Sequence, residues 1–127
     1  MKLFNFFSTK DFGENTRKIY AAVVKQAGHR YPVIDATALA MDSVRPYPGR
    51  GDIAVQGLNP EQIAERVPQE TEIIGIGCMF SSSWPLTRLV AEAVRARFPE
   101  ALMVLGGEHG TAVPDYVLFN SPFDVVV

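Results

Sequence analysis

The sequence contains little cysteine, no long apolar run and no run of basic residues. Cys78 is the only cysteine among 127 residues, so an internal disulfide and a three-cysteine cluster site are both excluded. No apolar stretch approaches the ~20 residues of a membrane-spanning helix. Twelve Lys and Arg residues against 14 Asp and Glu residues give a net charge of −2, which argues against binding nucleic acid through phosphate contacts. We expect a cytoplasmic domain without membrane or nucleic-acid partners.

Strand-like and helix-like segments alternate along the chain. Apolar residues make up 47% of the sequence and charged residues 20%, as in one globular domain. We expect strands at 2–8, 31–35, 72–78, 101–105 and 123–127, and helices at 14–28, 59–67, 85–98 and 113–119. This order predicts an α/β fold, namely a three-layer, doubly wound, parallel five-stranded sheet of the flavodoxin or Rossmann-like type.

Helix boundaries carry recognisable signals. Asn59 is a good N-cap, Pro60 suits the first helical position, and Gln62 occupies the capping-box position. The serines 81–83 precede another helix, and we expect at least one of them to cap it. We expect the arginines of that helix, Arg88, Arg95 and Arg97, to face solvent.

Residues 36–58 show no clean period and contain two prolines and three glycines. A loop of this length is uncommon inside a compact domain. We expect a lid, a contact surface or a poorly ordered segment.

Ligand sites of such sheets lie outside the carboxyl ends of the strands. The first, third and fourth expected strands are followed there by residues able to contact a ligand. The candidates are Ser8, Thr9, Lys10, Gly77, Met79, Phe80, Ser81, Ser82, Gly106, Gly107, Glu108 and His109. The pair Gly106-Gly107 would let a large flat ligand approach the backbone, or would form a plain tight turn.

Cys78 and His109 are the only obvious nucleophile–base pair at this edge. Nothing in the sequence supplies a third group to orient the histidine, and a small cysteine that ends an apolar strand is usually a packing residue. We therefore assign no catalytic residue. No cluster of His, Cys, Asp and Glu has zinc-like spacing, so no protein metal site is assigned either.

Three segments follow one another in the second half of the chain: EIIGIGCMF, MVLGGEHGTAVPDYVL and FDVVV. With them the chain resembles the cobalamin-binding domain that precedes the catalytic barrel in cobalamin-dependent radical S-adenosylmethionine enzymes. The resemblance covers most of the chain and is strongest over 72–127. It implies that Gly106 and Gly107 lie against the cobalamin nucleotide tail. Gly77 and Met79 match the first and third positions of the S-x-L motif of such domains.

Two departures from the family's pattern affect the expected site. Gly77 replaces the motif serine, so the resemblance implies that a hydrogen bond to the tail is lost or is supplied by Ser81 or Ser82. After the first strand, 10–13 read KDFG where methionine-synthase-type domains have D-x-H-x-x-G, whose histidine ligates cobalt. The resemblance therefore implies base-off cobalamin without a histidine ligand.

The resemblance makes residues 1–127 a cofactor carrier rather than a complete enzyme. The corrin would supply the chemistry, with methyl transfer as the expected reaction of the parent enzyme. The iron–sulfur cluster and S-adenosylmethionine would belong to the absent barrel of the same parent chain. Since the strand pattern finishes at Val127, we expect a C-terminally truncated domain that lacks its last helix.

Two alternatives from other classes remain open at this point. A flavodoxin-like domain with a degenerate site would act as a contact module. A thiol enzyme would use Cys78 and His109. A phospho-receiver is disfavoured because Cys78 and Met79 stand where its acceptor Asp belongs, and a dinucleotide site would need G-x-G-x-x-G after the first strand.

Overall fold

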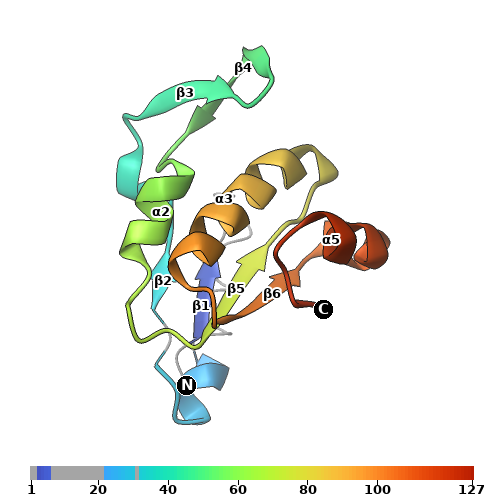
Figure 1. Ribbon diagram of the computed structural model, residues 1–127. Helices are drawn as coiled ribbons and strands as arrows, with labels where there is room; N and C mark the ends of the chain where they lie inside the picture. The colour runs from blue at the N-terminus through green and yellow to red at the C-terminus, as the bar shows by residue number, and fades with distance from the viewer. Residues whose placement is uncertain (1–2, 7–21, 31) are drawn as a thin grey trace.

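A computed structural model describes residues 3–6, 22–30 and 32–127 of the chain, the first group through its backbone alone. Helices and strands alternate over most of these residues (Figure 1). The expected α/β class is therefore confirmed. No helix in the described part of the chain combines the length and the apolar character needed to cross a bilayer.

The central sheet consists of strands that all pair in parallel. Its order is β2-β1-β5-β6-β7, with bounds Val33–Ile34, Leu3–Phe6, Ile73–Gly77, Leu102–Gly106 and Val125–Val126. The body of the sheet is β1, β5 and β6, while β2 and β7 add two residues each at the margins. All five expected strands are present, although the outer two are shorter than expected.

The core lies between the sheet and the helices α2 (Pro60–Arg66) and α3 (Trp84–Arg97). These helices lie side by side over one face of the sheet (Figure 1). Ile74 of β5 and Met103 and Leu105 of β6 have no solvent exposure. Val90 on α3 covers them from the helical layer. Burial alternates along both strands, because the residues between these buried ones are half-buried or, at Leu102, exposed.

The start of α2 follows its sequence signals. Asn59 Oδ1 accepts a hydrogen bond from the Gln62 backbone N–H at 2.8 Å, and Gln62 Oε1 accepts one from the Asn59 N–H at 2.9 Å. Pro60 begins the helix, where its missing N–H costs nothing. The predicted capping box is thus confirmed, and it directs the buried Ile63 towards the core.

The expected helix at 14–28 can be followed only in part. Residues 22–26 are helical, and Gly28 has φ +81°, as expected of a glycine that ends a helix. The rest of that helix lies outside the described residues.

The expectation of a long loop at 36–58 is wrong. The segment forms a 3-10 turn (Ala38–Ala40) and an antiparallel hairpin of β3 (Val44–Tyr47) and β4 (Arg50–Gln56), which projects beyond α2 (Figure 1). Pro48 and Gly49, with φ +76° at Gly49, make the tight turn. All residues of β4 except Val55 are exposed, so no apolar alternation marked the strand.

Two side chains tie this hairpin to the rest of the molecule. Arg45 donates to the carbonyls of Gly57 at 2.6 Å and Leu58 at 2.9 Å. Tyr47 donates through its hydroxyl to the Ser82 carbonyl at 2.5 Å. The hairpin therefore bridges the start of α2 and the start of α3.

The expectations for the ends and the solvent face of α3 need two corrections. Residues Ser81–Ser83 form a 3-10 turn, and no serine side chain caps α3. The backbone continues from that turn into the helix, which leaves Ser81 for another partner. Arg95 does not face solvent, because it donates to the carbonyls of Pro99, Ala101 and Pro122 and to Asp124 Oδ2.

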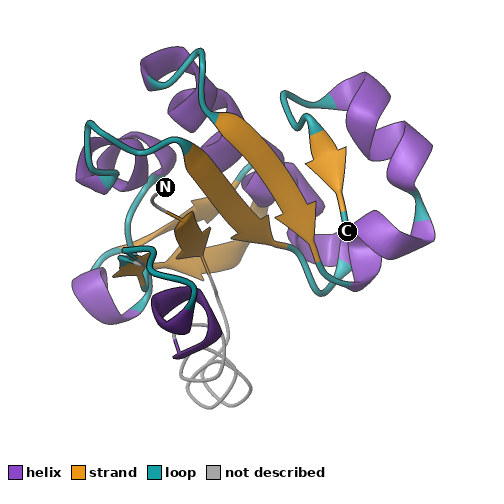
Figure 2. Ribbon diagram, turned by 90° about the horizontal axis from the view of Figure 1, so that it is seen from below, coloured by secondary structure: helices purple, strands orange, loops and turns teal. Residues whose placement is uncertain are grey.

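Beyond β6 the chain forms two short helices, α4 (Glu108–Ala112) and α5 (Pro114–Asn120). The expected helix at 113–119 corresponds to α5. It packs beside β7, close to the C-terminus (Figure 2). Trp84 of α3 is buried against this region, with its ring near those of Tyr116 and Phe123. The tryptophan therefore packs the core.

Candidate functional site

The loops after β5 and β6 meet at the carboxyl edge of the sheet. Gly77 and Gly106 are register partners at the ends of these strands. The Cys78 N–H donates to the Gly106 carbonyl at 2.8 Å, and the His109 N–H donates to the Cys78 carbonyl at 3.1 Å. The topology thus brings the two sets of candidate residues together, as the sequence predicted.

The loop after β5 presents an apolar pair to solvent. Met79 is 43% exposed and Phe80 is 59% exposed. The polar candidates Ser81 and Ser82, which follow them in the chain, are exposed, and so is Glu108 after β6. Neighbouring large apolar side chains that stay exposed to solvent need an explanation, whereas a single exposed apolar residue does not. We call Met79, Phe80, Ser81, Ser82 and Glu108 the edge cluster.

Ser81 and His109 join the two loops through their side chains. Ser81 Oγ and His109 Nδ1 are 2.9 Å apart. The imidazole is buried and stacks on the indole of Trp84, with 4.8 Å between ring centroids. Its Nε2 is buried without a hydrogen-bond partner. Burial lowers the pKa of His109, so the ring is neutral at neutral pH and holds the Ser81 hydroxyl.

A pH dependence of stability follows from this burial. The unfolded chain takes up a proton on His109 near pH ~6.5, whereas the folded chain takes it up only at lower pH. The contribution of His109 to the free energy of unfolding is therefore complete above ~6.5 and lost as the pH falls from there to the folded-state pKa. We expect His109→Gln to flatten this slope in urea titrations at several pH values.

The matched control is Ser81→Ala. It removes the hydrogen bond at Nδ1 but leaves the imidazole buried, and burial is the cause of the lowered pKa. We expect the slope to persist in this variant. A slope that disappears with Ser81→Ala would show that the serine, not burial, sets the protonation of His109.

Cys78 is poorly placed for nucleophilic chemistry. Its side chain is 1% exposed, and Sγ lies 3.4 Å from the Phe80 carbonyl. Burial raises the pKa of the thiol, which disfavours the reactive thiolate. The imidazole of His109 is engaged with Ser81 instead. These features weigh against the thiol-enzyme alternative.

The paired glycines have different structural roles. Gly107 has φ +101° and ψ 171°, a conformation essentially restricted to glycine. A Cβ there would lie 2.6 Å from the Cys78 carbonyl oxygen and 2.9 Å from its carbon. Gly107 is therefore required by the contact between the two loops. At Gly106 an added Cβ would have one neighbour within 4 Å among the described residues, Val127 Cγ2 at 3.7 Å.

Some of the expected site remains outside the structure. Ser8, Thr9 and Lys10 lie outside the described residues, so their relation to the edge cluster stays a prediction. Among the residues that are described, no group of three or more His, Cys, Asp and Glu side chains could hold a metal ion.

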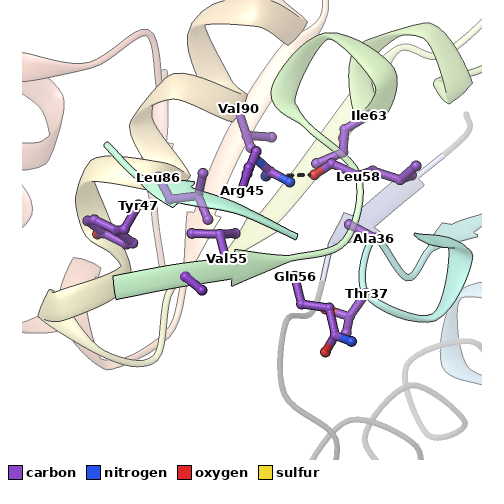
Figure 3. Close-up of a pocket in the computed structure, with 11 residues that line it drawn as sticks. Ala36, Thr37, Arg45, Tyr47, Val55, Gln56, Leu58, Ile63, Leu86 and Val90 are labelled. Atoms are coloured by element: carbon purple, nitrogen blue, oxygen red, sulfur yellow. Dashed lines mark hydrogen bonds between the residues drawn. The ribbon is translucent and has the colours of Figure 1, made fainter. Parts of the chain in front are cut away.

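A cavity of about 300 Å³ lies beneath the β3–β4 hairpin and shares no lining residue with the edge cluster (Figure 3). Its walls come from the hairpin, α2, α3 and the segment after β2. The lining residues are Ala36, Thr37, Arg45, Tyr47, Ala54, Val55, Gln56, Leu58, Ile63, Leu86 and Val90. The sequence did not indicate this cavity, because it depends on a hairpin that was expected to be a loop. The Pro48-Gly49 turn was the available signal.

Comparison of the sequence with protein-family models gives no match, and no curated protein matches it either.

Proposed function

We propose that this chain binds cobalamin at the carboxyl edge of its parallel sheet. It would do so as the N-terminal, cofactor-carrying domain of a cobalamin-dependent radical S-adenosylmethionine enzyme of the methyltransferase type. The single observation that carries the proposal is the exposed apolar pair Met79 and Phe80 at this edge. A corrin is a large, flat, mainly apolar ring system, and burying exposed apolar side chains against it is favourable.

The strand order supports the position of the site. The chain passes from β1 to β2 on one side and then returns to add β5 on the other side of β1. In doubly wound folds of the flavodoxin type, such a switch point marks the ligand crevice. The proposal therefore includes this three-layer, doubly wound architecture. The edge cluster begins two residues after β5, directly at the switch point.

The fit of the edge residues to cobalamin is uneven. Ser81 and Ser82 offer exposed hydroxyls for the polar groups of the cofactor, and His109 fixes the first of them. Gly106 leaves room for a close approach. Gly107 does not, because the backbone of Cys78 fills the space beside it. We therefore assign the tail contact to Gly106 and the packing role to Gly107.

The histidine at this edge is unsuited to be an axial ligand. His109 Nδ1 is engaged with Ser81, and Nε2 is buried where the ring stacks on Trp84. The proposal is therefore base-off cobalamin without a histidine ligand. When bound, the cofactor would supply methyl transfer, while the chain would bind it, orient it and shield one of its faces. The iron–sulfur cluster and S-adenosylmethionine would be held by a barrel in the same parent chain.

Reconstitution tests this proposal. The chain is mixed with hydroxocobalamin, freed of excess by gel filtration, and examined by visible absorption and, after reduction to cob(II)alamin, by electron paramagnetic resonance. We expect retained corrin absorbance and no splitting from a coordinated histidine nitrogen. Nitrogen splitting that disappears in His109→Gln would contradict the axial-ligand part. A protein fraction without corrin would contradict the function itself.

One observation favours a contact module as the second candidate. Leu39, Met41, Val44 and Ile53 are 42–64% exposed on the 3-10 turn and the hairpin. Contiguous exposed apolar patches are typical of protein contact surfaces, and these four side chains come from one stretch of the chain, 39–53. A chain that retains no corrin but associates through these residues would support this candidate over cobalamin binding.

A further inference from the structure

The cavity beneath the hairpin has mainly apolar walls. Seven of its lining residues are aliphatic: Ala36, Ala54, Val55, Leu58, Ile63, Leu86 and Val90. Figure 3 shows the side chains of Val55 and Leu86 on one side and those of Ile63 and Leu58 on the other. A volume of about 300 Å³ is at the lower end of the range for small-molecule sites. Such walls would accommodate a short aliphatic chain.

One cation lies among these apolar walls. The Arg45 side chain extends between Val90 and the Leu58 segment (Figure 3). Its two terminal nitrogens donate to the carbonyls of Gly57 and Leu58. No carboxylate pairs with it within the described part of the chain. The two carbonyls accept hydrogen bonds from some of the five N–H groups of the guanidinium, but they do not neutralise its positive charge.

The polar neighbours of Arg45 in the cavity do not supply the missing negative charge. Tyr47 donates its hydroxyl to Ser82, and Gln56 donates its amide to the Met41 carbonyl. Thr37 is neutral. A half-buried cation next to apolar surface is costly unless it is paired. The complementary ligand carries one negative group for Arg45 and an aliphatic body for the walls.

From this geometry we propose that the cavity binds a small aliphatic monocarboxylate. The carboxylate accepts hydrogen bonds from the N–H groups of Arg45 that the two carbonyls leave free, and the alkyl chain packs against Leu86, Val90 and Ile63. None of the cavity's lining residues belongs to the edge cluster, and the proposal does not depend on cobalamin. Tyr47 lines the cavity and joins the hairpin to Ser82. A monocarboxylate bound in the cavity would therefore also stabilise the position of the hairpin over α3.

The test uses the 127-residue chain with hexanoate as the probe and hexylamine as its cationic counterpart. Methyl resonances of Val55, Leu58, Leu86 and Val90 are followed by NMR during each titration. We expect saturable shifts of these methyl groups with hexanoate and at least tenfold weaker binding of hexylamine, because its ammonium faces Arg45. Equal affinity for both probes, or no shift at the cavity methyl groups, would overturn the proposal.

Two variants separate charge from shape. Arg45→Gln removes the cation and is expected to weaken hexanoate binding at least tenfold. Ala54→Leu fills the cavity from an exposed strand and keeps Arg45. We expect Ala54→Leu to abolish hexanoate binding. This variant keeps the test decisive if Arg45→Gln does not fold. Ile53→Leu is the matched control, because Ile53 is an exposed residue of the same strand that does not line the cavity. Unchanged hexanoate binding in Ala54→Leu would also overturn the proposal.

Discussion

Gly107→Ala is expected to reduce the free energy of unfolding by about 3–5 kcal/mol, from backbone strain and overpacking together. The backbone at Gly107 has φ +101° and ψ 171°, which a residue with a Cβ avoids. The new methyl group would also lie within 3 Å of the Cys78 carbonyl carbon and oxygen. These atoms belong to the hydrogen-bonded junction of the two edge loops and cannot move independently. Urea denaturation followed by circular dichroism measures the loss.

Gly106→Ala is the matched control one residue earlier. Its methyl group would make one ordinary contact, with Val127 Cγ2 at 3.7 Å. We expect a change below about 1 kcal/mol. Equal losses in the free energy of unfolding for the two variants would show that the close contact between Gly107 and Cys78 does not constrain this junction.

Arg95→Met is expected to cost about 2–4 kcal/mol, because it leaves partly buried acceptors without their donor. Arg95 joins the end of α3 to the segment before β7 through Pro99, Ala101, Pro122 and Asp124. The carbonyls account for most of the loss. The ion pair with Asp124 adds less, because that carboxylate is 45% exposed and screened by water. The same denaturation experiment applies.

The control for Arg95→Met is Arg97→Met, on the exposed face of the same helix. We expect this variant to change stability by less than about 0.5 kcal/mol. A small effect at both positions would contradict the role of Arg95 in fastening β7.

Asp124 should make the same junction sensitive to acid. Burial by itself would raise the pKa of Asp124, but the Met103 N–H and the hydrogen bond and charge of Arg95 outweigh it, so the pKa is lowered. A lowered folded-state pKa means that this stabilisation is complete above the unfolded value of about 3.9 and lost as the pH falls through the folded value. The difference in stability between the wild type and Asp124→Asn should therefore shrink in acid.

The sequence predicted best those elements whose signals are local. The capping box of Asn59 and Gln62 located the start of α2. The apolar runs of β5 and β6 located two strands of the sheet whose alternate residues are fully buried. By contrast, the hairpin at 44–56 buries little surface of its own, so it lacked the alternation that marks a half-buried strand.

The candidate site was predictable in position but not in its internal contacts. The rule for parallel sheets correctly brought Met79 and Ser81 to the same edge as His109. Which side chains would pair there depends on tertiary packing. At least one of the serines 81–83 was expected to cap α3, but none of their side chains does, and Ser81 binds His109 instead. Likewise, Arg95 reaches acceptors far along the chain that helical periodicity does not indicate.

Equilibrium dialysis against hydroxocobalamin is the most direct test of cobalamin binding at the edge cluster. Three proteins are compared: the wild type, the edge variant Met79→Asp/Phe80→Asp, and the control Leu39→Asp/Val44→Asp on the exposed hairpin region. The account predicts that the wild type and the control bind alike, and that the edge variant binds at least tenfold more weakly because its carboxylates would have to be desolvated against the corrin. Equal binding by all three proteins, or none by the wild type, would contradict it.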